Sequence, residues 1–126
     1  MNPKMLPVGI CAHLSPSMMS RHALSTGYQL ALVPITLEAA REMAPLILSQ
    51  FSAPAAASCV GYRNSADVIG HALNISLPQN RALVSLEIGD TVLLAHLSGR
   101  RLPEMATSLP EGTHLSFYLG HLLELS

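Results

Sequence analysis

Charged residues are scarce in this chain of 126 residues: they make up 12% of it, whereas hydrophobic residues make up 49%. A domain of this length buries roughly two thirds of the surface that its unfolded chain exposes. With so little charge, most of the chain must be buried within the protomer or against a second subunit. We therefore expect a homodimer.

The chain also lacks an excess of positive charge, since its formal net charge is −1. Binding of long nucleic acid depends on a broad basic surface that follows the phosphates, so we expect no such partner. A small phosphorylated ligand needs only a few arginines. Four of the seven basic residues lie in three short stretches of the second half, namely Arg63, Arg81, Arg100 and Arg101. This clustering favours a small anionic ligand, with an ordinary solvated surface as the alternative.

The motifs of common nucleotide and metal sites are absent. There is no GxxxxGK[ST], GxGxxG, HExxH or CxxC, so triphosphate, dinucleotide and zinc sites have no support. The six histidines occur singly, and Cys11 and Cys59 lie in separate apolar runs. We expect neither a metal nor another cofactor, and we interpret both cysteines as small buried hydrophobic residues in a reducing compartment.

No targeting or membrane segment is evident. The first nine residues, MNPKMLPVG, lack the charged segment and the long apolar stretch of a signal peptide. No run approaches the ~20 apolar residues that a membrane-spanning helix needs. We expect a cytoplasmic protein without a membrane partner.

Hydrophobic periodicity predicts one α/β domain over residues 1–126, in which two main helices pack on a mixed β-sheet of about five to six strands. Short apolar or alternating runs predict strands at 6–12, 28–35, 55–60, 81–88, 91–98 and 114–125. The fourth and fifth runs are expected to form a hairpin across Gly89 and Asp90. The stretch 15–27 is expected to be a loop or a short helical turn.

Two helices are predicted between these strands. The first follows Thr36, whose hydroxyl can cap it, and Pro45 is expected to kink or end it. The second follows Gly61 and extends to about residue 73. Because Asn64 and Ser65 lie in its first turn, its unpaired backbone N–H groups form a candidate anion site. An ordinary capped helix start is the alternative.

From Gly61 onward, several short motifs follow one another in a recognisable order. They are Gly61-Tyr62, the helix to Leu73, Gln79-Asn80-Arg81, Ile88-Gly89-Asp90, Arg101-Leu102-Pro103-Glu104 and Ser116-Phe117-Tyr118. Their order and separations resemble those of the viral anti-CRISPR ring nuclease family, first seen in archaeal viruses, and of related CRISPR-associated ring nucleases.

The resemblance implies a ligand and a reaction. Members of that family act on cyclic tetra-adenylate, a cyclic oligoadenylate messenger of type III CRISPR systems, and they need no metal. A ribose 2′-OH attacks its own 3′-phosphate in line, which gives a 2′,3′-cyclic phosphate and a free 5′-OH. A cyclic tetranucleotide has a two-fold axis, and a homodimer matches it by presenting every residue twice.

The resemblance also implies site residues. Arg81 and Arg101 would bind phosphates through their forked donors, and Glu104 would orient the ribose or assist proton transfer. Apart from the resemblance, Arg63 at the start of the second predicted helix could add a third charge. Further ligand contacts are expected from Ser15, Gly61, Asn64, Ser65 and Arg100.

The proton donor is left open, because Tyr62 stands where the family has its catalytic histidine. The two residues after it are Arg63 and Asn64 rather than an acid and a serine, and Ala12 replaces a ligand-contacting asparagine. A tyrosine phenol with an ordinary pKa near ~10 donates poorly at pH 7 unless a neighbouring cation such as Arg63 lowers that pKa. His13 is the other candidate acid.

Each of these residues also has a simpler interpretation. Tyr62 could only stack on an adenine, Arg81 could pair with Glu87 or Asp90, and Arg100 and Glu104 could be ordinary loop charges. Three functions follow: a metal-independent ring nuclease, a sponge that captures the messenger in the same pocket, and a structural protein without a nucleotide ligand. The motifs favour the first.

Overall fold

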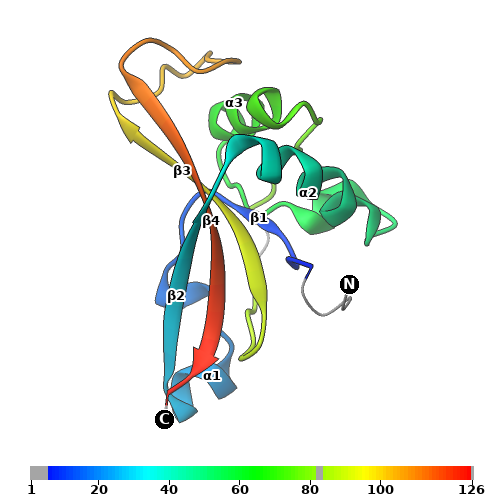
Figure 1. The fold of residues 1–126 in the computed structure, drawn as a ribbon, viewed down its shortest axis with the longest axis vertical. Helices are drawn as coiled ribbons and strands as arrows, with labels where there is room; N and C mark the ends of the chain where they lie inside the picture. Colours follow the sequence, from blue (N-terminus) through cyan, green and yellow to red (C-terminus); the bar gives the residue numbers. More distant parts are fainter. Residues whose placement is uncertain (1–5, 82–83, 126) are drawn as a thin grey trace.

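The computed structural model describes residues 6–81 and 84–125 of the chain (Figure 1). The strands and helices are β1 (Ile10–Cys11), α1 (Arg21–Thr26), β2 (Tyr28–Ile35), α2 (Leu37–Ser49), α3 (Arg63–Leu73), β3 (Thr91–Gly99) and β4 (Thr113–Glu124). Two short 3₁₀ helices, Pro16–Met18 and Pro54–Ala57, precede α1 and α3. Within the described ranges, no helix is both long enough and apolar enough to cross a bilayer.

The four strands form one mixed sheet in the order β1-β3-β4-β2. β1 runs parallel to β3, and β4 pairs antiparallel with both β3 and β2. The prediction of a single α/β domain with a mixed sheet is confirmed, although the described residues form four strands rather than five or six, accompanied by three α-helices rather than two.

The two faces of the sheet build two separate cores. Residues paired across neighbouring strands point to the same face. One face packs against α2 and α3, in a core that includes Ile10, Ala44, Ile47, Ile69, Leu93 and Phe117. The other face packs against α1 and the chain before it, in a core that includes Cys11, Met18, Met19, Ala23, Leu94 and Leu122. Figure 1 shows α2 and α3 beside one half of the sheet and α1 near its opposite end.

Helix α2 continues through Pro45, so the expectation that the helix ends there is wrong. Its start is as predicted, because the Thr36 hydroxyl accepts a hydrogen bond of 3.1 Å from an N–H of the first turn. Proline leaves the Arg41 carbonyl without its helical donor. Both positions are exposed, so water can satisfy this carbonyl, while the buried Ala44 and Ile47 hold the helix against the core.

The predicted strands at 55–60 and 81–88 are wrong. Residues 54–57 form a 3₁₀ helix, and Ser58 makes one isolated bridge to Ile10. In the second run, residues 82 and 83 lie outside the described residues, and Leu86 makes a single bridge to Met19. The predicted hairpin across Gly89 and Asp90 therefore does not form. Short apolar runs suit both strands and buried coil, and pairing with a neighbour decides between them.

The stretch 15–27, expected to be a loop or a helical turn, contains α1. Ser20 caps this helix, because its Oγ accepts a hydrogen bond of 3.0 Å from the Ala23 N–H. The same hydroxyl donates to the Glu87 carboxylate at 2.5 Å, and the Asp90 carboxylate accepts from the Glu87 N–H at 2.8 Å. The segment before β3 is thus attached to α1 by polar contacts instead of a strand ladder.

Gly70 tests the packing between α3 and the segment that follows it. A Cβ added there would lie 2.8 Å from the Ile75 carbonyl oxygen and 3.2 Å from the Leu77 Cβ. Alanine favours a helix over glycine by about 1 kcal/mol, but crowding in a packed core costs about 1–3 kcal/mol. We expect Gly70→Ala to lower the urea midpoint, with His71→Ala as the exposed control. An unchanged or raised midpoint for Gly70→Ala would contradict this packing.

Candidate functional site

Two adjacent pockets lie on either side of Tyr62, the residue that precedes α3. The first, about 310 Å³ in volume, lies between the start of α3 and the β3–β4 hairpin and is called the hairpin pocket. The second, also about 310 Å³, lies near the end of β1 and is called the strand-end pocket. Tyr62 is 66% exposed and lines both, so one ligand that reaches both pockets would contact it.

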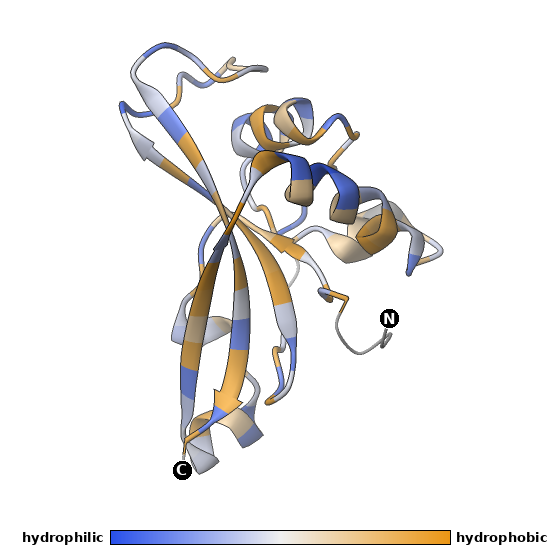
Figure 2. Cartoon of the chain, in the orientation of Figure 1, coloured by the Kyte–Doolittle hydropathy of each residue, from blue (hydrophilic) through white to orange (hydrophobic). Residues whose placement is uncertain are grey.

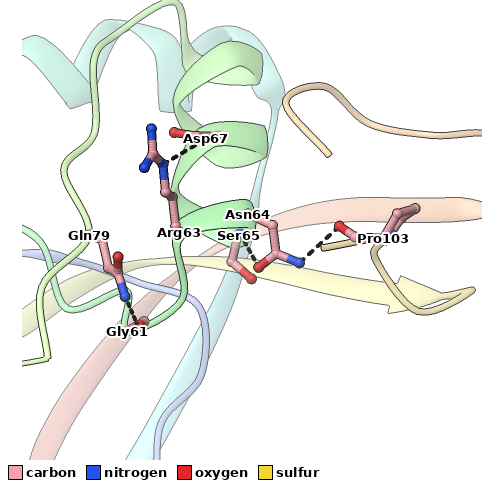
Figure 3. Close-up of polar contacts among 7 residues, drawn as sticks. All are labelled: Gly61, Arg63, Asn64, Ser65, Asp67, Gln79 and Pro103. Atoms are coloured by element: carbon pink, nitrogen blue, oxygen red, sulfur yellow. Dashed lines mark hydrogen bonds and ion pairs between the residues drawn. The ribbon is translucent and has the colours of Figure 1, made fainter. Parts of the chain in front are cut away.

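The Gly61 carbonyl oxygen holds the segment after α3 beside the start of this helix. It accepts hydrogen bonds from Gln79 Nε2 at 2.7 Å, drawn in Figure 3, and from Arg81 Nε at 2.8 Å. Between them, the Asn80 side-chain amide donates to two carbonyl oxygens of residues 55–58, at 2.8 and 3.0 Å. Three consecutive side chains therefore attach to the chain that leads into α3.

Arg81 lies over the ring of Tyr62, with the guanidinium carbon 5.5 Å from the ring centroid. This distance is within the range of cation–π attraction. Arg81 thus contacts Tyr62 and Gly61, and it forms no ion pair with Glu87 or Asp90, so the pairing considered from the sequence is not made. The contact holds the Arg81 side chain in the wall of the strand-end pocket, beside the Tyr62 ring that both pockets share.

Asn64 connects the first turn of α3 to the loop between β3 and β4. Its Nδ2 donates to the Pro103 carbonyl oxygen at 3.1 Å, and its Oδ1 accepts from the Ser65 N–H at 2.9 Å (Figure 3). Tyr62, at the N-cap, makes no side-chain capping bond. The helix start is therefore partly satisfied by Asn64, and it offers a ligand fewer free N–H groups than the sequence suggested.

Arg100 and Arg101 line the hairpin pocket because the strand ends turn sharply there. Gly99 and Gly112 have φ angles of 87° and 86°, a region that glycine adopts readily. The Arg100 N–H donates to the Gly112 carbonyl at 2.8 Å, and the Thr113 hydroxyl donates to the Arg100 carbonyl at 2.8 Å. The carbons of the Arg100 side chain lie against Gly112, where an added Cβ would come within 2.9 Å of Cδ.

The charge of both pockets favours an anion. Arg100 and Arg101 line the hairpin pocket, whereas Arg81 and His13 line the strand-end pocket. No carboxylate is among the described residues that line either one. Guanidinium groups without a neutralising acid are suited to phosphate, which they bind through paired donors.

The structure brings most of the predicted site residues to these pockets. The hairpin pocket contains Tyr62, Asn64, Ser65, Arg100 and Arg101, and the strand-end pocket contains His13, Gly61, Tyr62 and Arg81.

Ser15, Arg63 and Glu104 lie outside the lining of both. The Arg63 side chain lies along α3, with its Nε 3.8 Å from the Asp67 carboxylate (Figure 3). The cation beside Tyr62 is therefore Arg81 rather than Arg63. The Ser15 hydroxyl shares a hydrogen bond of 2.8 Å with that of Ser17, and Glu104 is exposed.

Sequence reasoning missed several lining residues, among them Ser17, Cys59, Asn80 and Thr113. Asn80 belongs to the Gln79-Asn80-Arg81 motif, which could have identified it. The others have no local pattern, because they reach the pockets only through the fold. Among the residues that the structure describes, no group of three histidine, cysteine or acidic side chains could hold a metal ion.

A comparison with protein-family models matches residues 16–117 to the STIV B116-like family. The chain belongs to the STIV B116-like family. Among solved structures, B116 of Sulfolobus turreted icosahedral virus is similar to it, with a TM-score of 0.68 and 17% sequence identity over 91% of this chain and 98% of that chain. At this identity the similarity establishes the fold alone. A comparison with curated proteins finds no match.

The family match supports, at the level of the fold, the resemblance to proteins of archaeal viruses. The family match extends from residue 16 to residue 117, so it includes α1, β2 and α2 as well as the motifs that carried the resemblance, apart from Tyr118. Both pockets lie almost entirely within the matched residues.

Asn64 provides a test of how the hairpin pocket is closed. Replacing it by alanine removes the side-chain hydrogen bond from the first turn of α3 to Pro103, so the loop 100–106 should exchange its amide hydrogens faster. The global free energy of unfolding should fall by about 1 kcal/mol or less. Hydrogen–deuterium exchange of this loop checks the prediction, with Arg63→Ala as the control in the same turn. Equal exchange in Asn64→Ala and the unmodified protein would contradict it.

Proposed function

We propose that this STIV B116-like protein binds cyclic oligoadenylates and linearises them without a metal. In this reaction a ribose 2′-OH attacks the adjacent phosphorus, the bond from phosphorus to the 5′-oxygen breaks, and a 2′,3′-cyclic phosphate and a free 5′-OH are produced. The observation that supports the proposal is the convergence of Arg81, Arg100 and Arg101 on two pockets that share Tyr62.

The arginines are assigned to the phosphates. The attacked phosphorus becomes more crowded and more negative in the transition state, and donors already fixed in place stabilise that charge. Arg81 Nε is bonded to the Gly61 carbonyl, and the Arg100 backbone and side-chain carbons lie against Gly112. Each pocket also has a volume in the range of small-molecule sites, which is about 300–1,000 Å³.

The leaving 5′-oxygen needs a proton, and Tyr62 and His13 are the two proposed donors. Tyr62 stands on the border between the pockets, and His13 lines the strand-end pocket. Because histidine is the more usual general acid, the tyrosine at the family's histidine position supports a second candidate function, in which the protein captures the ring without cutting it. Tyr62 would then serve to stack on an adenine, for which its 66% exposure leaves room.

We propose a homodimer as the active form, formed through the bare sheet face. This name denotes one face of the β2–β4 pair, consisting of Ala31, Val33, Leu119, His121 and Leu123. Val33 and Leu123 expose 46% and 40% of their surface. Figure 2 shows hydrophobic residues along β2 and β4 in the half of the sheet away from α2 and α3. Two copies related by a two-fold axis would cover this face and match the symmetry of a cyclic tetranucleotide.

Incubation with labelled cyclic tri-, tetra- and hexa-adenylate in the presence of EDTA tests the activity. We expect linear products that end in a 2′,3′-cyclic phosphate, because no step requires a metal. Tight retention of the intact ring would instead support capture, and the absence of any binding would contradict both functions.

Variants then test the site within the same assay. Arg81→Gln and Arg101→Gln should each weaken ring binding by at least about 10-fold, the effect of losing a charge-assisted contact, whereas Arg63→Gln serves as a control outside the pockets. The proton donor should be revealed by Tyr62→Phe and His13→Ala. Loss of the general acid lowers the cleavage rate by about 10²-fold or more while binding is retained.

The dimer makes a separate prediction. Val33→Glu places a charge in the proposed interface of each subunit, so this variant should be a monomer by size-exclusion chromatography with light scattering, and it should lose ring cleavage. Leu24→Glu is the matched control, since Leu24 is 51% exposed on α1, outside the bare sheet face. An unmodified protein that is monomeric at micromolar concentration would contradict the interface.

A further inference from the structure

Two cysteines that are distant in the sequence lie side by side at the strand-end pocket. Ser58 bridges Ile10 in parallel, and the Cys59 N–H donates to the Ile10 carbonyl at 2.9 Å. The next pair in this register is Cys11 and Cys59. Neighbouring strands lie about 4.8 Å apart, and disulfides join Cα atoms about 4.4–6.8 Å apart. The backbone spacing therefore already suits a disulfide.

The two thiols differ in their surroundings. Both cysteines are free, but Cys11 is completely buried, whereas Cys59 is partly exposed and lines the strand-end pocket beside His13 and Arg81. A small reagent that enters this pocket therefore meets Cys59 first. Cys11 lies behind it, in the core on the same face of the sheet.

A hydrogen bond between the thiols makes Cys59 the more reactive of the two. The Cys11 S–H donates to the Cys59 sulfur, which lowers the pKa of Cys59 against the opposing effect of its partial burial. The same hydrogen bond, together with burial, raises the pKa of Cys11. Since the thiolate is the nucleophile, Cys59 is the residue that attacks an oxidant first. Cys11 stays protonated until it attacks the oxidised Cys59.

We propose that Cys59 and Cys11 are a peroxide-oxidised thiol pair, in which Cys59 reacts first and Cys11 resolves it to an intramolecular disulfide. In the first step the Cys59 sulfur attacks hydrogen peroxide: an S–O bond forms, the O–O bond breaks, and the leaving hydroxide takes up the thiol proton as water. In the second step the Cys11 sulfur attacks Cys59: the S–S bond forms, the S–O bond breaks, and hydroxide leaves with the Cys11 proton as a second water. Two thiols are oxidised by two electrons, and one peroxide is reduced to two waters.

This chemistry is independent of the proposed nuclease. It requires no nucleotide, no metal and no second subunit, because both sulfurs belong to one chain. The thiol pair nevertheless lies close to the candidate site, since Cys59 is two residues before Gly61, whose carbonyl accepts a hydrogen bond from Arg81. The disulfide is therefore a covalent modification in the wall of the strand-end pocket.

Thiol counting tests the proposal on the unmodified protein. The chain has two cysteines, so reduced protein should show two thiols by Ellman's reagent after denaturation and none after treatment with hydrogen peroxide. Mass spectrometry should find the loss of two hydrogens and a peptide pair joined through Cys11 and Cys59, and dithiothreitol should restore both thiols. Short exposure of reduced native protein to iodoacetamide should label Cys59 several-fold faster than Cys11.

Two variants separate the roles of the sulfurs. In Cys11→Ala, peroxide should drive Cys59 to sulfinic acid, because no resolving thiol is present. In Cys59→Ala, Cys11 should stay reduced, because it is buried. Survival of both thiols in the unmodified protein, a disulfide only between chains, or faster labelling of Cys11 would each overturn the proposal. These readouts on the unmodified protein hold even where a variant fails to fold.

Discussion

The arrangement of the candidate site depends on one backbone oxygen, the carbonyl of Gly61. A carbonyl has two lone pairs, and here both meet side chains of the segment after α3, those of Gln79 and Arg81. Arg81 donates to this carbonyl through Nε, so its terminal N–H groups are not used in this hydrogen bond. The side chain is held over Tyr62. A backbone contact thus positions both an arginine and an aromatic ring, and it does so without an acid that would neutralise the charge.

The sheet places a second group of arginines near this contact. Strand β4 pairs with β3 in a hairpin whose connecting loop lies beside the start of α3, and Asn64 joins the helix to that loop through Pro103. Two arginines from the hairpin therefore lie opposite the start of α3, although almost forty residues separate them from Tyr62 in the chain. The helix start is a modest anion site by itself. The hairpin arginines, held by glycines with positive φ, supply most of the positive charge of the hairpin pocket.

The low charge content of the chain has two structural consequences. Few ionic groups are available, and the described residues include a single ion pair, Arg63 with Asp67, so no described carboxylate neutralises the arginines that line the two pockets. The apolar surplus exceeds what the two cores bury, which leaves Val33 and Leu123 partly exposed on the bare sheet face. Low net charge and exposed apolar surface both favour association over repulsion.

Local sequence determined the parts of the structure that depend on neighbouring residues. The Thr36 cap, the strand 28–35 and the final strand were predictable, because capping and alternation act over a few residues, and the motifs named Arg81, Arg101 and Tyr62 as site residues. Only the tertiary structure decided that 55–60 and 84–88 are not strands, that Arg81 rather than Arg63 meets Tyr62, and that Cys11 adjoins Cys59. Each of these results depends on contacts between segments far apart in the chain, and local periodicity holds no information about which distant segment will be the neighbour.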